Sequence, residues 1–256
     1  MRATGRGCDA SPVEQADERD LATALNDAGS QAARVACCSA SGLALAEVGR
    51  VLWVGGYIVG PDRAAGESPF AFGSDATVGL ATVAQVGAEL LGGVGALLPL
   101  GNRYAALALI RQLVEVEYLA WAFAEDEPEA ASWLRSSPQE RRRRWQPGHL
   151  RARSAGRFRS TDYGRHCEMG GHPTPDARRA LPDHIDGFPT ELCWYEATSH
   201  GVRIWEYVQA AAEKLGYGEL LDGLSSTTSL APAVARWRES DRLHVLFTGA
   251  STPFQL

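Results

Sequence analysis

The chain lacks most of the sequence features that assign a protein to a structural or functional class. It has five cysteines without the regular spacing of a disulfide framework, and its apolar share of 45% excludes disordered and collagen-like classes. No secretory apolar stretch follows Met1 or precedes Cys8, so we expect reduced thiols and a cytoplasmic protein. The usual catalytic fingerprints are also absent, among them a Walker loop, a Gly-x-Ser-x-Gly elbow, Cys-x-x-Cys and His-Glu-x-x-His.

Lysine is nearly absent as well, because Lys214 is the only one among 25 basic residues. The net charge of −6 argues against a protein that binds nucleic acid over its whole surface. However, the stretch from Arg135 to Arg165 holds ten arginines against Glu140 and Asp162. Its charge of +8 leaves −14 for the rest of the chain. The basic character is therefore local.

Apolar residues recur at three- and four-residue steps, which predicts helices and no confident strand. The expected helices cover about 12–58 with divisions near Gly29 and Gly42, then 75–98, 103–124, 128–134, a helix opening at 137, 190–215 and 231–247. Residues 1–11 read as a tail, 60–75 as a loop and 173–189 as a proline-rich loop. We therefore expect an all-α fold, an irregular multi-helix bundle, with an N-terminal helical region at 1–100 and a second helical domain at 101–256. The helices at 102–124 and 190–215 should pack together.

The segment 76–101 is long enough to span a bilayer and carries Glu89 as its only charge. It is rich in glycine and alanine, with Gln85 and Glu89 near its middle. We expect a buried helix and no membrane, and a subunit interface is a further possible role of this segment.

Arg111 and Glu115 form the first candidate for a functional site. They lie four residues apart on the clearest helix, so they share one face next to the apolar residues Val114 and Tyr118. Such a pair is either a structural ion pair or the wall of a site.

The second candidate is the run from Arg165 to His172. An arginine can bind a scissile phosphate with two donors, and a histidine can move the proton of an attacking 2′-hydroxyl. His166 directly after the arginine is polar, and Gly170 and Gly171 before His172 suggest that His172 lies on a loop. This pattern suits RNA cleavage without a metal.

The Arg-x6-His run, with its polar residue after the arginine, resembles the signature of the HEPN superfamily of helical ribonucleases and nucleotide-binding domains. The upstream Arg-x-Leu-Val-Glu helix also resembles a related helical family of unknown function. The resemblance implies a metal-independent endoribonuclease of a defence or toxin–antitoxin system, without cofactor. It makes Arg165 and His172 the catalytic pair and His166, Arg111 and Glu115 supporting residues. It also implies a homodimer, with RNA and an antitoxin-like protein as partners.

The run of four arginines at 141–144, close to this motif in the sequence, has two interpretations. It is either a path for RNA phosphates or a solvated helix paired with the acidic segment 125–129. The expected RNA-binding residues are Arg141, Arg142, Arg143 and Arg144.

Two other function classes remain open from sequence. One is a catalytically silent helical module that binds a nucleotide, RNA or a protein. The other is a metal site, for which the donors are His166, Cys167, His172, His184, Cys193 and His200. Their spacing does not favour tetrahedral zinc, and Glu196 and His200 are four apart where di-iron bundles need Glu-x-x-His, so we expect no metal. Cys37 and Cys38 are adjacent on a helix and poorly placed for a disulfide.

Overall fold

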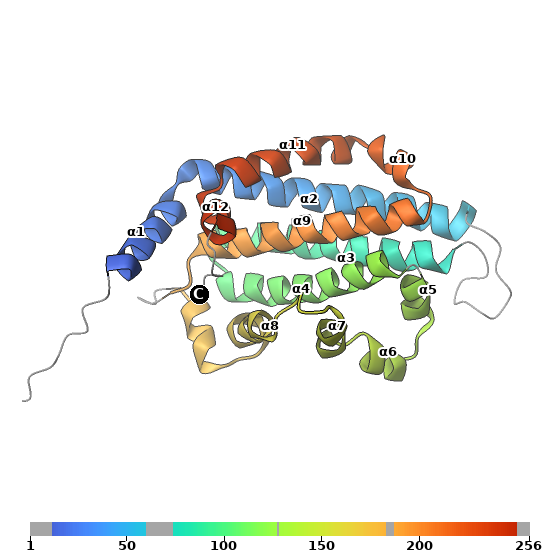
Figure 1. Cartoon of the computed structure of the whole chain (residues 1–256), viewed down its shortest axis with the longest axis horizontal. Coiled ribbons are helices and arrows are strands. Elements are labelled where there is room, and N and C mark those ends of the chain that lie inside the picture. Colours follow the sequence, from blue (N-terminus) through green and yellow to red (C-terminus); the bar gives the residue numbers. More distant parts are fainter. Residues whose placement is uncertain (1–11, 60–73, 127, 183–186, 250–256) are drawn as a thin grey trace, which may run out of the picture.

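A computed structural model describes residues 12–59, 74–126, 128–182 and 187–249. All regular elements in these ranges are helical, which confirms the all-α bundle. Figure 1 labels twelve α-helices: α1 (Pro12–Asn26), α2 (Ala28–Val54), α3 (Asp75–Leu97), α4 (Arg103–Glu125), α5 (Pro128–Arg135), α6 (Pro138–Arg144), α7 (Pro147–Arg153), α8 (Ser160–His166), α9 (Thr190–Lys214), α10 (Gly218–Asp222), α11 (Ser225–Ser240) and α12 (Arg242–Gly249). The expected tail at 1–11 and most of the expected loop at 60–75 lie outside the described residues.

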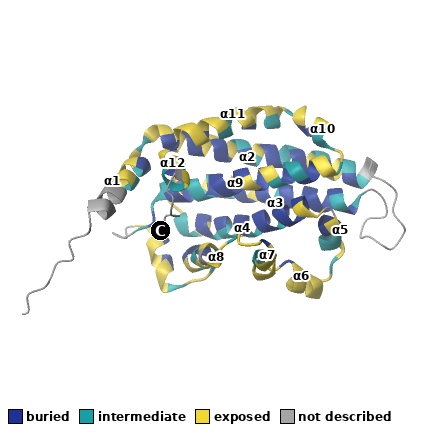
Figure 2. Ribbon diagram, viewed as in Figure 1, coloured by how far each residue is buried: buried dark blue, intermediate teal, exposed yellow. Residues whose placement is uncertain are grey.

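Four long helices, α2, α3, α4 and α9, form the body of the bundle (Figure 1). Small residues let α2 and α3 approach closely. A Cβ added at Gly49 would lie 2.6 Å from Gln85 Cγ and 3.2 Å from the Gln85 backbone nitrogen. One core cluster draws on both the 1–100 and the 101–256 regions, and Figure 2 shows buried residues along the inner faces of these helices.

The predicted packing of α4 against α9 is confirmed. The apolar residues expected on the two faces are all buried: Ile110, Val114, Tyr118, Val202, Trp205 and Val208. Val202 belongs to a smaller cluster with Cys37 and Trp237, so one side of α9 faces α2 and α11.

Two predicted helix boundaries differ from the structure. The expected division at Gly42 is absent, because α2 runs unbroken from Ala28 to Val54, and the chain breaks instead at Asp27, which caps α2. The last helix was expected at 231–247. It is instead split at Asp241 into α11 and α12, because the Asp241 carboxylate accepts the backbone N–H of Leu243 at 3.0 Å and caps α12.

Short helices α5 to α8 connect α4 to α9; α7 and α8 lie along α4, α5 packs on α3 and α4, and α6 packs on α7 (Figure 1). A π-helical turn over Cys167–Gly171 extends α8 and packs on α4, and the described part of the proline-rich loop holds a 3-10 helix at Pro175–Ala180. This connection carries His166 to the surface of α4 and α9.

Two helical segments are long and apolar enough to span a membrane by length and composition. They cover Ala28–Tyr57 and Asp75–Leu100, with mean hydropathy of 1.4 and 1.5 in their most apolar windows. The core helix of a soluble protein passes the same test, and both segments contribute to the bundle core, for example through Leu45 and Val83.

Candidate functional site

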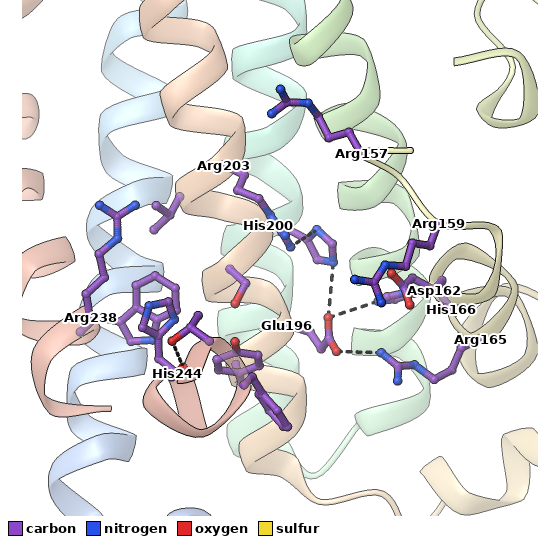
Figure 3. A pocket seen from close by; sticks show the side chains of 16 residues that line it. Arg157, Arg159, Asp162, Arg165, His166, Glu196, His200, Arg203, Arg238 and His244 are labelled. Atoms are coloured by element: carbon purple, nitrogen blue, oxygen red, sulfur yellow. Dashed lines mark hydrogen bonds and ion pairs between the residues drawn. The ribbon is translucent and has the colours of Figure 1, made fainter. Parts of the chain in front are cut away.

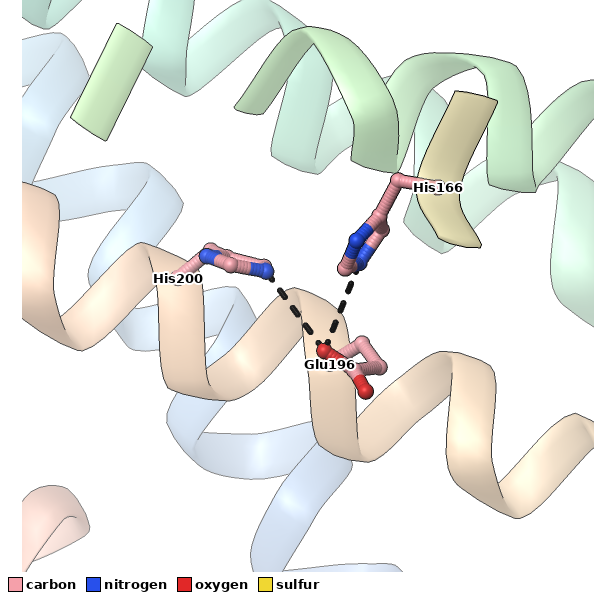
Figure 4. Close-up of side chains that lie close together, drawn as sticks. All are labelled: His166, Glu196 and His200. Carbon is pink, nitrogen blue, oxygen red and sulfur yellow. Dashed lines mark ion pairs between the residues drawn. The ribbon is translucent and has the colours of Figure 1, made fainter. Parts of the chain in front are cut away.

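Three side chains from two helices meet at the surface of α4. Glu196 and His200 lie one turn apart on α9, and His166 is the last residue of α8 (Figure 4). The Nε2 atoms of both histidines lie 3.5 Å from Glu196 Oε2. One donor atom from each residue falls within 4.8 Å of the other two. We call these residues the His–Glu–His cluster.

Glu117 on α4 contacts the cluster through His200. Its Oε2 lies 2.5 Å from His200 Nδ1, and its Oε1 lies 3.2 Å from Arg203 Nε. Glu117 is 2% exposed, so its charge depends on these two partners. The contacts of Glu117 with His200 and Arg203 join α4 to α9 beside the cluster.

The charges in the cluster stabilise one another. Burial opposes ionisation of Glu196, but its interactions with His166 and His200 outweigh burial and hold the pKa of Glu196 well below its usual value. Burial acts to lower the pKa of His200, yet the carboxylates of Glu117 and Glu196 raise it overall. Burial likewise opposes ionisation of Glu117, and Arg203 and His200 lower its pKa. A negative charge at Glu196 is therefore the stable state, and Arg165 and the two histidines lie beside it.

A pocket of about 420 Å³ opens over the His–Glu–His cluster (Figure 3). Among the described residues, Asp162 and Glu196 are the acidic ones that line it, and its lining includes the aromatic rings of Tyr195 and Phe247. The arginines that line it come from the segment before α8 and from α8, α9 and α11: Arg157, Arg159, Arg165, Arg203 and Arg238. With neutral histidines the lining is positive, which suits an anionic ligand on an acidic protein.

The structure places Arg165 and His166 in this pocket and leaves His172 out of its lining. Arg165 Nη2 lies 3.2 Å from Glu196 Oε1. His172 follows the π-helical turn in an extended conformation and is exposed. The loop position suggested by Gly170 and Gly171 therefore agrees with the structure, but Arg165 and His172 do not share this pocket.

Arg111 and Glu115 lie on α4 but do not line the pocket. Their ion pair of 2.8 Å is joined by Tyr163, whose hydroxyl donates to Glu115 Oε1 at 2.8 Å and accepts from Arg111 Nη2 at 3.1 Å. Arg111 Nε also lies 3.5 Å from Cys167 Sγ. These contacts fasten α8 and the following turn to α4, so the pair positions His166 indirectly.

The arginine run lies on α6, which packs against α7 (Figure 1). Arg144 pairs with the buried Glu129 at 3.0 Å, and Arg141 donates to the Ser136 carbonyl. Arg142 and Arg143 are exposed. None of Arg141, Arg142, Arg143 and Arg144 lines the pocket over the cluster.

Most of the cysteine and histidine donors considered for metal binding lie apart from the cluster. Cys37, Cys38, Cys167 and Cys193 are free thiols, while Cys8 and His184 lie outside the described residues. Burial raises the pKa of Cys37, Cys38 and Cys193 to about 12, so these three thiols stay protonated.

The sequence pattern did not single out Glu117 or Arg203. It gave Glu196 only as part of an incomplete di-iron motif, and His200 in that motif and among the candidate metal donors. The available signal was a glutamate in the apolar stripe of α4, between Val114 and Trp121. A buried charge of this kind marks a place where a partner must lie opposite.

The fold and the pocket define an all-α helical-bundle protein with a buried His–Glu–His cluster beneath an arginine-lined pocket. Compared with protein-family models, curated proteins and solved structures, the chain matches none of them. Its function is therefore argued from the chemistry of the pocket.

Proposed function

We propose that the arginine-lined pocket binds the phosphate backbone of single-stranded RNA and cleaves it at the His–Glu–His cluster. The observation that carries this proposal is the convergence of five arginines around two histidines and a glutamate in one pocket. Guanidinium groups are suited to phosphate because their donors form a planar fork. Tyr195 and Phe247 supply rings on which a base can stack.

In the proposed reaction the RNA 2′-hydroxyl attacks the neighbouring phosphorus. A bond forms between O2′ and phosphorus, the bond from phosphorus to O5′ breaks, and one proton passes in balance from O2′ to O5′. Arg165 stabilises the charge that builds on the phosphate oxygens. The cluster handles the proton, because it lies beside Arg165 and both of its histidines line the pocket.

The resemblance to HEPN ribonucleases supports the same reaction class and the role of Arg165 and His166. The site proposed here keeps Arg165 and His166 from the expected one, adds Glu196 and changes the second histidine. His200 from α9 takes the place that the sequence pattern gives to His172, because His200 lies 3.5 Å from Glu196 in the cluster and His172 is exposed outside the pocket.

The test is cleavage of an end-labelled single-stranded RNA by purified full-length protein, beside DNA of the same sequence. We expect RNA cleavage that falls at least about 100-fold in His200→Ala and in Arg165→Lys, since a point charge does not reproduce the guanidinium fork. His172→Ala is the matched control and should cleave as the wild type does.

Loss of cleavage in His172→Ala with retention in His200→Ala would contradict the proposed site. RNA binding without cleavage by the wild-type protein would contradict the proposed reaction and favour a silent RNA-binding module. Fluorescence polarisation with labelled RNA separates these outcomes.

A further inference from the structure

Hydrogen bonds at Nδ1 hold each histidine of the cluster in one tautomer. His166 Nδ1 lies 2.7 Å from the Asp162 carbonyl oxygen, and a carbonyl only accepts, so this nitrogen carries the hydrogen. His200 Nδ1 donates in the same way to Glu117 Oε2 at 2.5 Å. In the neutral rings, both Nε2 atoms therefore present lone pairs.

These lone pairs point toward a third electron-rich atom. Both Nε2 atoms face Glu196 Oε2 at 3.5 Å, an ion-pair distance that is long for a hydrogen bond. His200 Nε2 is buried and makes no hydrogen bond with any described residue. Three such atoms around one point repel one another unless a cation lies between them, either a proton on one ring nitrogen or a metal ion.

We propose that His166, Glu196 and His200 bind one divalent transition-metal ion of the zinc class. Metal–nitrogen and metal–oxygen bonds of about 2.0–2.1 Å in a tetrahedron place neighbouring ligand atoms about 3.4 Å apart. The two separations of 3.5 Å already match this edge. Two imidazoles and one carboxylate suit a borderline ion such as Zn²⁺ or Co²⁺.

The three ligands have the outer hydrogen-bond and ion-pair partners that are typical of metal-binding residues. Metal-binding histidines generally donate their other N–H to a carboxylate or a backbone carbonyl, and Glu117 and the Asp162 carbonyl occupy these places. The second oxygen of Glu196 is held by Arg165 at 3.2 Å. Each of the three ligands is thus oriented by its own outer partner.

Three protein ligands leave the fourth position of a tetrahedral ion to solvent or substrate. This is the arrangement of catalytic sites, whereas structural zinc sites are closed by four protein ligands. All three ligands line the arginine-lined pocket, from which solvent or substrate would reach the ion. A bound ion lowers the pKa of its water, which supplies a base at neutral pH.

The inference rests on the proposed function for the use of this base. With both Nε2 atoms bound to the ion, its water would take the proton in place of the histidine nitrogens, which replaces the metal-independent mechanism. Metal binding itself is independent of RNA.

The experiment is metal titration of full-length protein from which metals have been removed by a chelator. Zn²⁺ is followed by calorimetry and Co²⁺ by its visible absorption, which reports tetrahedral coordination. We expect one ion per chain, and affinity at least about 100-fold lower in His166→Ala, His200→Ala and Glu196→Gln. Circular dichroism checks folding, and His200→Gln is the second variant should His200→Ala fail to fold.

His172→Ala and His149→Ala are the matched controls, because both histidines are exposed outside the cluster. Their affinity for Zn²⁺ should equal that of the wild type. No stoichiometric ion in the wild type, or equal affinity in the ligand variants, overturns the inference. RNA cleavage by chelated protein would overturn the use of the ion as a base while supporting the proposed function, and a bound ion without RNA cleavage would contradict the proposed function alone.

Discussion

His200 Nδ1 and Glu117 Oε2 lie 2.5 Å apart in a contact that joins α9 to α4 beneath the pocket. Both side chains are buried, so little solvent competes for this hydrogen bond. The contact fixes the ring of His200 with its Nε2 atom toward Glu196 and the pocket. The orientation of the reactive nitrogen is therefore set by a carboxylate that lies outside the pocket.

The first prediction follows from this contact. Glu117→Gln removes the charge but keeps the size of the side chain, so Zn²⁺ affinity should fall about 10–100-fold while the helical content is kept. Glu125→Gln makes the same chemical change on an exposed position of α4 and should leave the affinity unchanged. The measurement is calorimetric titration of chelated protein with Zn²⁺. Equal affinities in the two variants would contradict the orienting role of Glu117.

The second prediction concerns the path of RNA. Arg157 and Arg159 are exposed on the pocket rim, so Arg157→Gln with Arg159→Gln should weaken RNA binding. The slope of log affinity against log salt should become shallower by about 0.7 per arginine removed. Arg142→Gln with Arg143→Gln removes the same charge from α6 and should change the slope little. A larger change in slope for the α6 variant than for the pocket variant would instead support the RNA path expected from the sequence.

The third prediction tests how the turn after α8 is placed. A Cβ at Gly170 would lie 2.4 Å from the backbone carbon of Leu107 and 2.6 Å from the backbone nitrogen of Ala108. Because backbone atoms of α4 cannot move aside alone, Gly170→Ala should displace the turn, lower the melting temperature and reduce Zn²⁺ affinity.

Gly164→Ala is the matched control for this substitution. Gly164 lies within α8 with open space around it, so alanine there should stabilise the protein by about 0.5–1 kcal/mol through helix propensity. Thermal unfolding followed by circular dichroism gives both values. Similar stability of the two variants would show that the turn does not need the close approach at Gly170.

Helix positions could be predicted from the sequence because apolar residues repeat with the helical period. This periodicity located α3, α4 and α9 and the burial of Ile110, Val114 and Val208. It did not locate the break at Asp241, because an aspartate within a helical pattern caps only when its carboxylate reaches a nearby N–H. Helix periodicity is local, whereas a cap of this kind depends on how the chain turns.

The candidate site could be predicted only in part for the same reason. Arg165 and His166 stand out in the sequence, and both line the pocket. The contacts of His166 with Glu196 and of Glu117 with His200 join residues far apart in the chain, and no spacing rule encodes them. From the sequence alone, Gly170 is predicted to break a helix. In the structure, its missing side chain lets the turn approach the backbone of α4.

The last prediction concerns the buried pair that joins α2 to the junction of α11 and α12. Arg34 Nε lies 2.8 Å from Asp241 Oδ2, and both side chains are fully buried. Asp241 also accepts hydrogen bonds from Trp237 Nε1 at 2.9 Å and from the backbone N–H of Leu243. Arg34→Met leaves the aspartate charge buried without its cation, so the free energy of unfolding in urea should fall by roughly 3–5 kcal/mol.

Two further variants separate the buried charge from lost packing. Adding Asp241→Asn to Arg34→Met removes the unpaired charge but keeps an acceptor for Trp237, so the double variant should be more stable than Arg34→Met alone. Glu206→Ala breaks the exposed pair with Arg238 and should change stability by less than about 1 kcal/mol. A double variant no more stable than Arg34→Met would show that the packing of the arginine side chain, not its charge, holds the C-terminal helices in place.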